Sequence, residues 1–224
     1  MTRCDQRVTV QLMAQNVTTV LVEPYTEPIS QPMAIRLPDS ILVSEDDFFE
    51  FCQLNRDLRI ERTAHGEILI MPPTGGETGN RGAEITFQLK LWAKRDGVGE
   101  VFDSSTGFIL PNTAMRSPDA AWVLRARLTK LTAEEKKKFI PLCPDFVIEL
   151  KSPSDNLKTV QAKMEEYIEN GARLGWLLDP DARRVHVYDA DGRREAIEAA
   201  ERISADPVLP GFTLDLADIW RPNI

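Results

Sequence analysis

The stretch Pro144-Asp145-Phe146-Val147-Ile148-Glu149-Leu150-Lys151 is typical of one buried β-strand that ends with an acid and a base two residues apart. Side chains alternate across a strand, so Phe146, Ile148 and Leu150 share one face. Val147, Glu149 and Lys151 share the other face. Because buried charges must be paired or must bind something, a carboxylate and an ammonium on one face of a core strand indicate a functional site.

A second acid, Asp119, lies upstream in the strand-like segment 117–123. A strand rises about 3.3 Å per residue, so Glu149 and Lys151 lie about 6.6 Å apart on their face. Asp145 shares this face, but at about 13 Å it is too far from Glu149 to bind the same ion. We therefore expect Asp119 to supply a second carboxylate from an adjacent strand.

Asp119, Glu149 and the backbone carbonyl of Leu150 form a candidate metal-binding set, since oxygen ligands and waters suit Mg²⁺ or Mn²⁺. Such an ion polarises a phosphate and activates water. Lys151 would orient that water and stabilise charge in the transition state. The spacing alone favours an alternative, a structural ion pair with Asp119 in a turn, because an Asp…Glu-x-Lys pattern is short and recurs by chance.

Glu84 is a further candidate, in a helix that we predict over residues 80–95. At 100° per residue, Glu84 falls within the apolar arc that contains Ile85 and Leu89. A buried acid needs a partner, which the metal ion or Lys151 would provide. An ordinary structural salt bridge explains the pattern equally well.

The composition bounds the class of protein. The 224 residues predict an arm over residues 1–35 and one domain over residues 36–224. From the sequence we expect no segment that crosses a bilayer and no export signal, since no apolar run is long enough. The three widely spaced cysteines argue against disulfides or a zinc site, which favours the cytoplasm.

The net charge of -8 argues against nucleic-acid binding, although a basic rim on an acidic body remains an alternative to solvated helix faces. The residues of such a rim would be Lys90, Lys94, Arg95, Arg125, Arg127, Lys130, Lys136, Lys137 and Lys138.

Periodicity and capping signals predict alternating helices and strands. Ser44 and Asp47 form a capping-box variant, and Thr132 and Glu135 form a capping box. The predicted helices cover residues 44–54, 80–95, 132–139 and 157–170, and residues 211–220 form a short closing helix. The predicted strands cover residues 58–62 and 67–71 as a hairpin, 98–103, 107–110, 119–124, 144–151, 174–178 and 184–188. We assign structural roles to His65 and His186, since neither belongs to a metal-binding pair.

From about Leu37 to Trp220 the chain resembles the Uma2 family of restriction endonucleases, within the PD-(D/E)xK nuclease superfamily, and in particular its cyanobacterial branch. The resemblance rests on the segments 59–62 (RIER), 73–80 (PTGGETGN), 117–120 (SPDA), 144–155 (PDFVIELKSPSD) and 175–180 (GWLLDP). It implies an α/β, restriction-endonuclease-like core, with a central mixed sheet flanked by helices, an N-terminal arm and a β-hairpin. It also implies a homodimer.

The resemblance maps the superfamily's metal acids onto Asp119 and Glu149, its lysine onto Lys151 and its helical glutamate onto Glu84. For Lys163, in the helix that follows the motif strand, we expect solvation at the surface rather than a contact with phosphate. The leading hypothesis is a Mg²⁺-dependent (or Mn²⁺-dependent) DNA endonuclease that leaves a 5′-phosphate. The alternatives are a non-catalytic binding or assembly protein on a nuclease scaffold, and a nuclease specific for RNA or for nucleic-acid structure.

Overall fold

The structure, a computed structural model, describes residues 33–36 and 44–224. The chain divides into two compact units, residues 1–73 and residues 74–224. The predicted boundary between residues 35 and 36 lies inside the first unit, and residues 1–32 and 37–43 lie outside the described part, so that boundary stays a prediction. None of the helices in the described ranges combines the length and the hydropathy needed to span a membrane.

The first unit contains a small antiparallel sheet with the strand order β1-β3-β2 and one helix. Ser44 caps the helix as predicted, because its hydroxyl accepts from the backbone N–H of Asp47 while the Asp47 carboxylate accepts from the Ser44 N–H. The predicted hairpin is also confirmed. The elements are β1 (Met33–Ile35), α1 (Glu45–Leu54), β2 (Arg59–Arg62) and β3 (Ile68–Met71).

The second unit contains the central sheet, two long helices and several short elements. They are α2 (Gly76–Asp96), β4 (Gly99–Asp103), β5 (Phe108–Ile109), β6 (Met115–Arg116), β7 (Ala120–Leu124), α3 (Arg125–Leu128), the 3₁₀ turn η1 (Glu135–Lys137), β8 (Phe146–Leu150), α4 (Leu157–Glu169), β9 (Leu174–Asp179), β10 (Arg184–Asp189), β11 (Arg194–Glu198), β12 (Arg202–Ser204), β13 (Thr213–Asp215) and α5 (Ala217–Trp220).

The central sheet has six strands in the order β11-β10-β9-β8-β7-β4. All neighbours are antiparallel except β8 and β9, which are parallel. Parallel neighbours need a crossover connection, and α4 provides it between β8 and β9. The fold is therefore a mixed α/β sheet flanked by helices, which confirms the predicted class.

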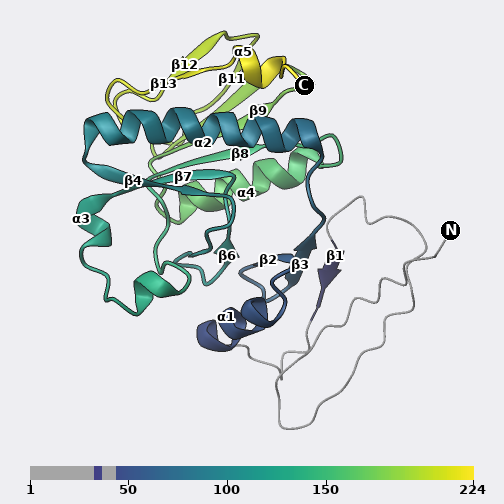
Figure 1. The fold of residues 1–224 in the computed structure, drawn as a ribbon, viewed down its shortest axis with the longest axis vertical. Helices are drawn as coiled ribbons and strands as arrows, with labels where there is room; N and C mark the ends of the chain where they lie inside the picture. The colour runs from purple at the N-terminus through teal and green to yellow at the C-terminus, as the bar shows by residue number, and fades with distance from the viewer. Residues whose placement is uncertain (1–32, 37–43) are drawn as a thin grey trace, which may run out of the picture. The chain divides into compact units, whose positions relative to one another are not determined.

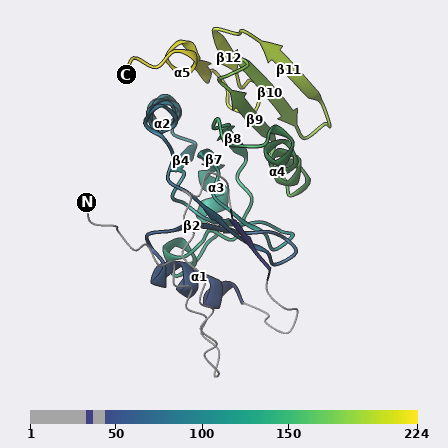
Figure 2. The same cartoon turned by 90° about the vertical axis from the view of Figure 1, so that its right-hand side faces the viewer.

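Two helices cover opposite faces of this sheet. Figure 1 shows α2 in front of β4, β7 and β8, and the quarter turn in Figure 2 shows α2 and α4 on either side of these strands. Ile85 and Leu89 of α2 share the main hydrophobic core with Trp122, Phe146 and other fully buried side chains. β12, β13 and α5 complete this core through Ile203, Leu214, Leu216 and Ile219. Because side chains alternate, residues 119, 121, 147 and 149 face the other side, toward α4.

Three predicted helices differ from the structure in their extent or type. The helix predicted over residues 80–95 begins at Gly76, since the Glu77–Arg81 ion pair of 3.1 Å supports a first turn that glycines disfavour. The charged segment 132–139 forms only the 3₁₀ turn η1, although its Thr132–Glu135 capping bonds are present, because it offers no apolar stripe to bury.

The closing segment was predicted as one helix, but its first half is strand β13 and only Ala217–Trp220 is helical. Leu214 is buried while its neighbours Thr213 and Asp215 are more exposed, which is the period of a strand. The edge strand β11 was not predicted at all. Its residues are mostly exposed and charged, so it carries no hydrophobic alternation.

Candidate active site

The strands β7 and β8 bring Asp119 and Glu149 together. Ala120 pairs with Ile148 in this antiparallel ladder, so the next position places Asp119 opposite Glu149 on the α4 side of the sheet. Opposite residues in such a pair have Cβ atoms about 4.5–5.5 Å apart. The Asp119 Oδ2 atom accepts the backbone N–H of Leu150 at 2.8 Å, which fixes the Asp119 carboxylate at the end of β8. The register of the two strands thus sets the two acids at opposite positions.

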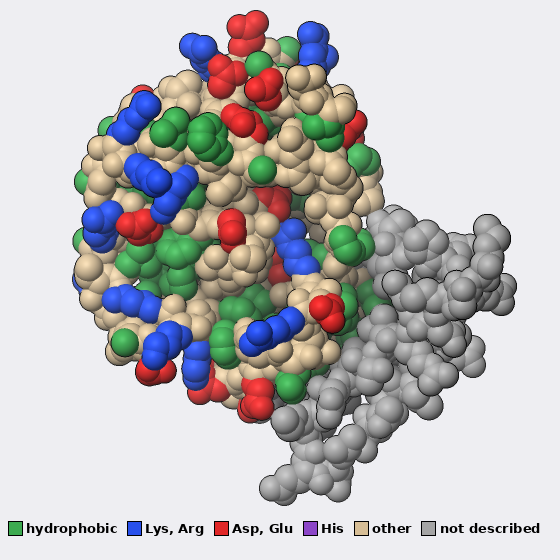
Figure 3. Space-filling model, in the orientation of Figure 1, with side chains coloured by type: hydrophobic (Ala, Val, Ile, Leu, Met, Phe, Trp, Pro, Cys, Tyr) green, Lys and Arg blue, Asp and Glu red, His purple; other side chains and the backbone are tan. Residues whose placement is uncertain are grey.

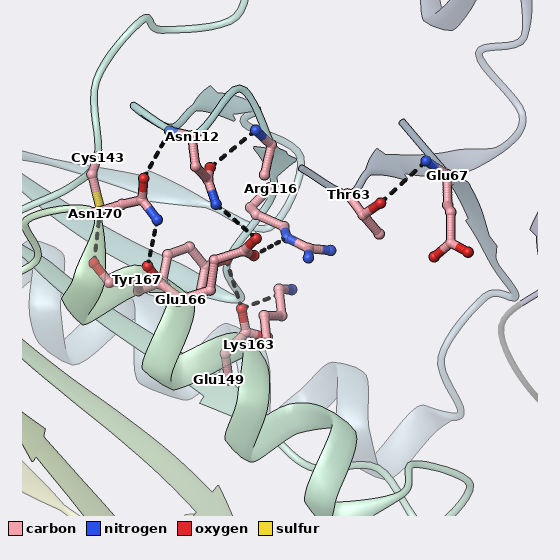
Figure 4. A network of polar contacts seen from close by, with 11 residues as sticks. Thr63, Glu67, Asn112, Arg116, Cys143, Glu149, Lys163, Glu166, Tyr167 and Asn170 are labelled. Atoms are coloured by element: carbon pink, nitrogen blue, oxygen red, sulfur yellow. Dashed lines mark hydrogen bonds and ion pairs between the residues drawn. The ribbon is translucent and has the colours of Figure 1, made fainter. Parts of the chain in front are cut away.

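The Glu149 carboxylate is buried under α4. Its Oε1 atom lies 2.8 Å from the Lys163 Nζ atom and accepts a 3.0 Å hydrogen bond from the Tyr167 hydroxyl (Figure 4). Lys163 and Tyr167 are four residues apart and therefore share one face of the helix. The Lys163 side chain is only 14% exposed, so the expectation of a surface-solvated lysine is wrong.

Lys151 contacts a different pair of acids. Its Nζ atom lies 3.2 Å from Asp181 Oδ2 and 3.9 Å from Asp179 Oδ1, and it donates to the Ser152 carbonyl. The parallel register explains this, since Glu149 lies beside Leu177 and Lys151 therefore lies beside Asp179. Among the ion pairs of residues 44–224, Lys163 rather than Lys151 contacts Glu149.

Glu84 lies on α2, the helix that covers the opposite face of the sheet from α4. The Glu84 Oε1 atom accepts from the Gln88 side chain at 2.9 Å. Gln88 in turn bonds both the N–H and the carbonyl of Asp215, so these side chains attach α2 to β13. No ion pair within the described ranges joins Glu84 to Lys151. Catalytic roles for Glu84 and Lys151 stay predictions.

A polar network attaches α4 to the segment 112–116 (Figure 4). The Glu166 carboxylate accepts from Arg116 Nε at 2.6 Å and from the Asn112 side chain at 3.0 Å. Asn170 accepts the Asn112 backbone N–H at 2.8 Å and donates its own amide to the Glu166 carbonyl. Sequence reasoning missed this network, because its members are distant in the chain and carry no motif. Its effect is to fix the helix that presents Lys163.

Asp145, the other acid of the motif strand, has a structural role. Its carboxylate accepts the Leu124 N–H at 2.9 Å and pairs with Arg127 at 3.0 Å. Only 3% of Asp145 is exposed. Its carboxylate therefore connects the start of β8 to the end of β7. The position agrees with the expectation that Asp145 does not share an ion with Glu149.

The donor set fits a hard divalent cation. Asp119 and Glu149 offer carboxylate oxygens on adjacent strands, and Asp119 is partly exposed to solvent. Residues 33–36 and 44–224 contain no group of three or more His, Cys, Asp or Glu side chains that could hold a metal. A cation at this position would take its ligands from these two acids, a backbone carbonyl and waters, which is a ligand set that Mg²⁺ accepts.

Basic side chains gather elsewhere, on the side where Figure 1 draws α3 and the neighbouring end of α2 (Figure 3). Acidic side chains lie between them. Glu100 bridges Lys90 at 3.0 Å and Arg125 at 2.9 Å, and Arg127 is committed to Asp145. The surface there is of mixed charge rather than uniformly basic.

A comparison with protein-family models identifies the family. Residues 45–217 match Uma2, which is described as "Putative restriction endonuclease". No curated protein matches the sequence. A solved structure described as a "putative nuclease belonging to DUF820 from Anabaena variabilis ATCC 29413" is similar, with a TM-score of 0.61 and 19% identity over 72% of this chain and 89% of the other. That likeness shows the fold, and the match over most of the sequence shows the family: the chain belongs to the Uma2 family.

Proposed function

We propose that the protein is a Mg²⁺-dependent endonuclease that hydrolyses phosphodiester bonds in DNA. The observation that supports the proposal is the register of β7 and β8, in which the position next to the Ala120–Ile148 pair is that of Asp119 and Glu149. A cationic side chain beside Glu149 supports it further, since a metal acid and an ammonium are the groups that phosphoryl chemistry requires. Membership of the Uma2 family supports a nucleic acid as the substrate.

In this proposal Asp119, Glu149 and the Leu150 carbonyl hold the divalent cation. When bound, the cation supplies Lewis-acid polarisation of the scissile phosphate and lowers the pKa of a water. The Leu150 N–H orients the Asp119 carboxylate, and the Tyr167 hydroxyl orients the Glu149 carboxylate. Both acids are thus positioned before substrate arrives, which limits the reorganisation that the reaction needs.

Lys151 and Glu84 complete the proposed residue set. Lys151 lies at the end of β8 beside Asp181, whose side chain is 63% exposed, and from there its ammonium would contact a phosphate of the incoming strand. Glu84 would have to exchange its Gln88 contact for a place near the cation. Substitutions of these two residues in the same assay test their roles separately. A homodimer, which the family resemblance predicts, is tested by light scattering. A cytoplasmic location, which the cysteine usage predicts, is tested by cell fractionation.

A specific observation favours a second candidate, a non-catalytic binding or assembly protein. Glu149 is ion-paired with Lys163, and the described residues contain no group of three or more His, Cys, Asp or Glu side chains that could hold a metal. The net charge of -8 also opposes binding to a polyanion. Under this alternative the buried ion pair would only stabilise the scaffold. The alternative predicts that neither Mg²⁺ nor Mn²⁺ binds at millimolar concentration.

The deciding experiment is a nicking assay on supercoiled plasmid with Mg²⁺ or Mn²⁺, with single-stranded DNA and RNA as parallel substrates. The substitutions Asp119→Asn and Glu149→Gln should reduce cleavage about a hundredfold or more, because each keeps the side-chain shape but removes a ligand charge. Glu165→Gln, an exposed change on α4, is the control and should leave the rate unchanged. Cleavage by the wild type in excess chelator, or by Glu149→Gln at the wild-type rate, would refute the mechanism. Cleavage of RNA alone would reassign the substrate.

A further inference from the structure

We infer that Lys163 of α4, rather than the motif lysine Lys151, is the cationic group of the catalytic centre and contacts the scissile phosphate. The inference rests on the proposed function and deepens it. Lys163 Nζ lies 2.8 Å from Glu149 Oε1, whereas the Lys151 Nζ contacts are with Asp181, Asp179 and the Ser152 carbonyl. The sequence motif thus names one lysine, and the tertiary structure places another beside the metal acid.

The burial of the pair gives the Lys163 charge its effect. The side chains of Lys163 and Glu149 are 14% and 6% exposed. Charges in such surroundings are weakly screened, so an ammonium there acts on its neighbours far more strongly than a solvated surface lysine does. Any phosphate oxygen that approaches Glu149 enters the field of this ammonium. The Lys163 ammonium is therefore suited to stabilise negative charge that grows on the phosphate.

The position of Lys163 is also fixed before substrate binds. The ammonium lies 5.9 Å from the centre of the Tyr167 ring, and the Tyr167 hydroxyl bonds the same Glu149 oxygen. Three residues along the same helix, Glu166 is held by Arg116 and Asn112. A long lysine side chain ordinarily loses much rotamer freedom when it is fixed. The fold has already fixed the Lys163 side chain, so the loss of its conformational entropy does not reduce the affinity for substrate.

The same geometry predicts an effect on cation affinity. Lys163 places a positive charge at the Glu149 carboxylate, and this charge opposes a divalent cation on the same group. Removal of the charge should therefore tighten cation binding. Lys151 faces the Asp179 and Asp181 carboxylates, which offset its charge, so its removal should change cation affinity much less. Cation affinity is a readout that does not depend on turnover.

The test compares Lys163→Met, Lys163→Arg and Lys151→Met with the control Lys158→Met, which removes an exposed lysine from the same helix. Titration calorimetry with Mn²⁺ alone at about pH 8, where carboxylates are ionised, should show about tenfold tighter binding for Lys163→Met. Plasmid nicking should fall about a hundredfold in Lys163→Met. Lys163→Arg should recover part of the nicking. Lys158→Met should stay within about threefold of wild type in both assays, and Lys151→Met should stay within about threefold of wild type in Mn²⁺ affinity.

Several outcomes overturn the inference. One is loss of nicking in Lys151→Met with nicking retained in Lys163→Met. Another is Mn²⁺ affinity that is the same in wild type and Lys163→Met, and a third is the absence of any Mn²⁺ binding. If wild type binds Mn²⁺ but cleaves none of the three substrates, the proposed function fails. In that case tighter binding by Lys163→Met alone still supports the place of Lys163 at the cation site, so the two failures are distinguishable. Circular dichroism of each variant checks that it is folded.

Discussion

Replacement of Glu166 by alanine tests whether the polar network holds α4 in place. Glu166 is the residue on which the network converges, because its carboxylate accepts from both Arg116 and Asn112. Its side chain is 16% exposed, and that of Arg116 is 10% exposed. The Glu166→Ala change removes the acceptor for two donors without creating a large cavity. It therefore measures the polar contribution to the attachment of the helix.

The structure sets the expected size of the loss. Removal of one partner from a buried ion pair costs about 3–5 kcal/mol. The residual exposure of both side chains admits some water, which lowers the expected loss in the free energy of unfolding to about 2–4 kcal/mol. For a chain of this size each kcal/mol shifts Tm by about 2–4 °C. The melting temperature of Glu166→Ala should therefore fall by roughly 4–16 °C, with about 9 °C as the central value.

The measurement is thermal unfolding followed by circular dichroism, with urea unfolding as a second determination. The matched control is Glu165→Ala, which removes an exposed carboxylate from the adjacent position of α4 and should change stability by less than about 0.5 kcal/mol. The reasoning is refuted if Glu166→Ala and Glu165→Ala melt at the same temperature. Since α4 carries Lys163, the Mn²⁺ affinity of Glu166→Ala should also differ from that of the control.

Two further predictions concern the core. A Cβ atom at Gly99 would lie 2.3 Å from the fully buried Trp122 ring, so Gly99→Ala should lower the free energy of unfolding in urea by about 1–3 kcal/mol. Gly175→Ala should lower it less, because its Cβ meets the flexible end of Met164 at 2.5 Å. Equal losses in the two variants would contradict this reasoning. Burial raises the pKa of the Cys143 thiol from 9.0 to about 12, so the folded state favours the neutral thiol and this stabilisation is lost as the pH rises from about 9 toward 12. The free energy of unfolding should accordingly fall more steeply with pH in wild type than in Cys143→Ala, and parallel slopes would rule out this contribution.

Elements with strong local signals could be predicted from the sequence. The Ser44–Asp47 cap, the hairpin of β2 and β3, and α4 followed by Gly171 were all predicted close to their observed bounds, because caps, turns and apolar periodicity act between near neighbours. Elements that depend on distant partners were missed or wrong. Strand β13 is one example, since it forms only by pairing with β12. Pairing between distant segments leaves little trace in a local window.

The sequence alone determined how the charged residues of the motif strand are spaced. Alternation along one strand sets Glu149 and Lys151 on the same face, and the distance along the strand leaves Asp145 too far away to join them. Only the tertiary structure decided which cation meets Glu149. The register of β8 against β9 places Lys151 beside Asp179. The packing of α4 on the sheet brings Lys163 and Tyr167 to the Glu149 carboxylate. The physical reason is that spacing within a strand is fixed by backbone geometry, whereas contacts between a strand and a helix depend on how the whole core packs.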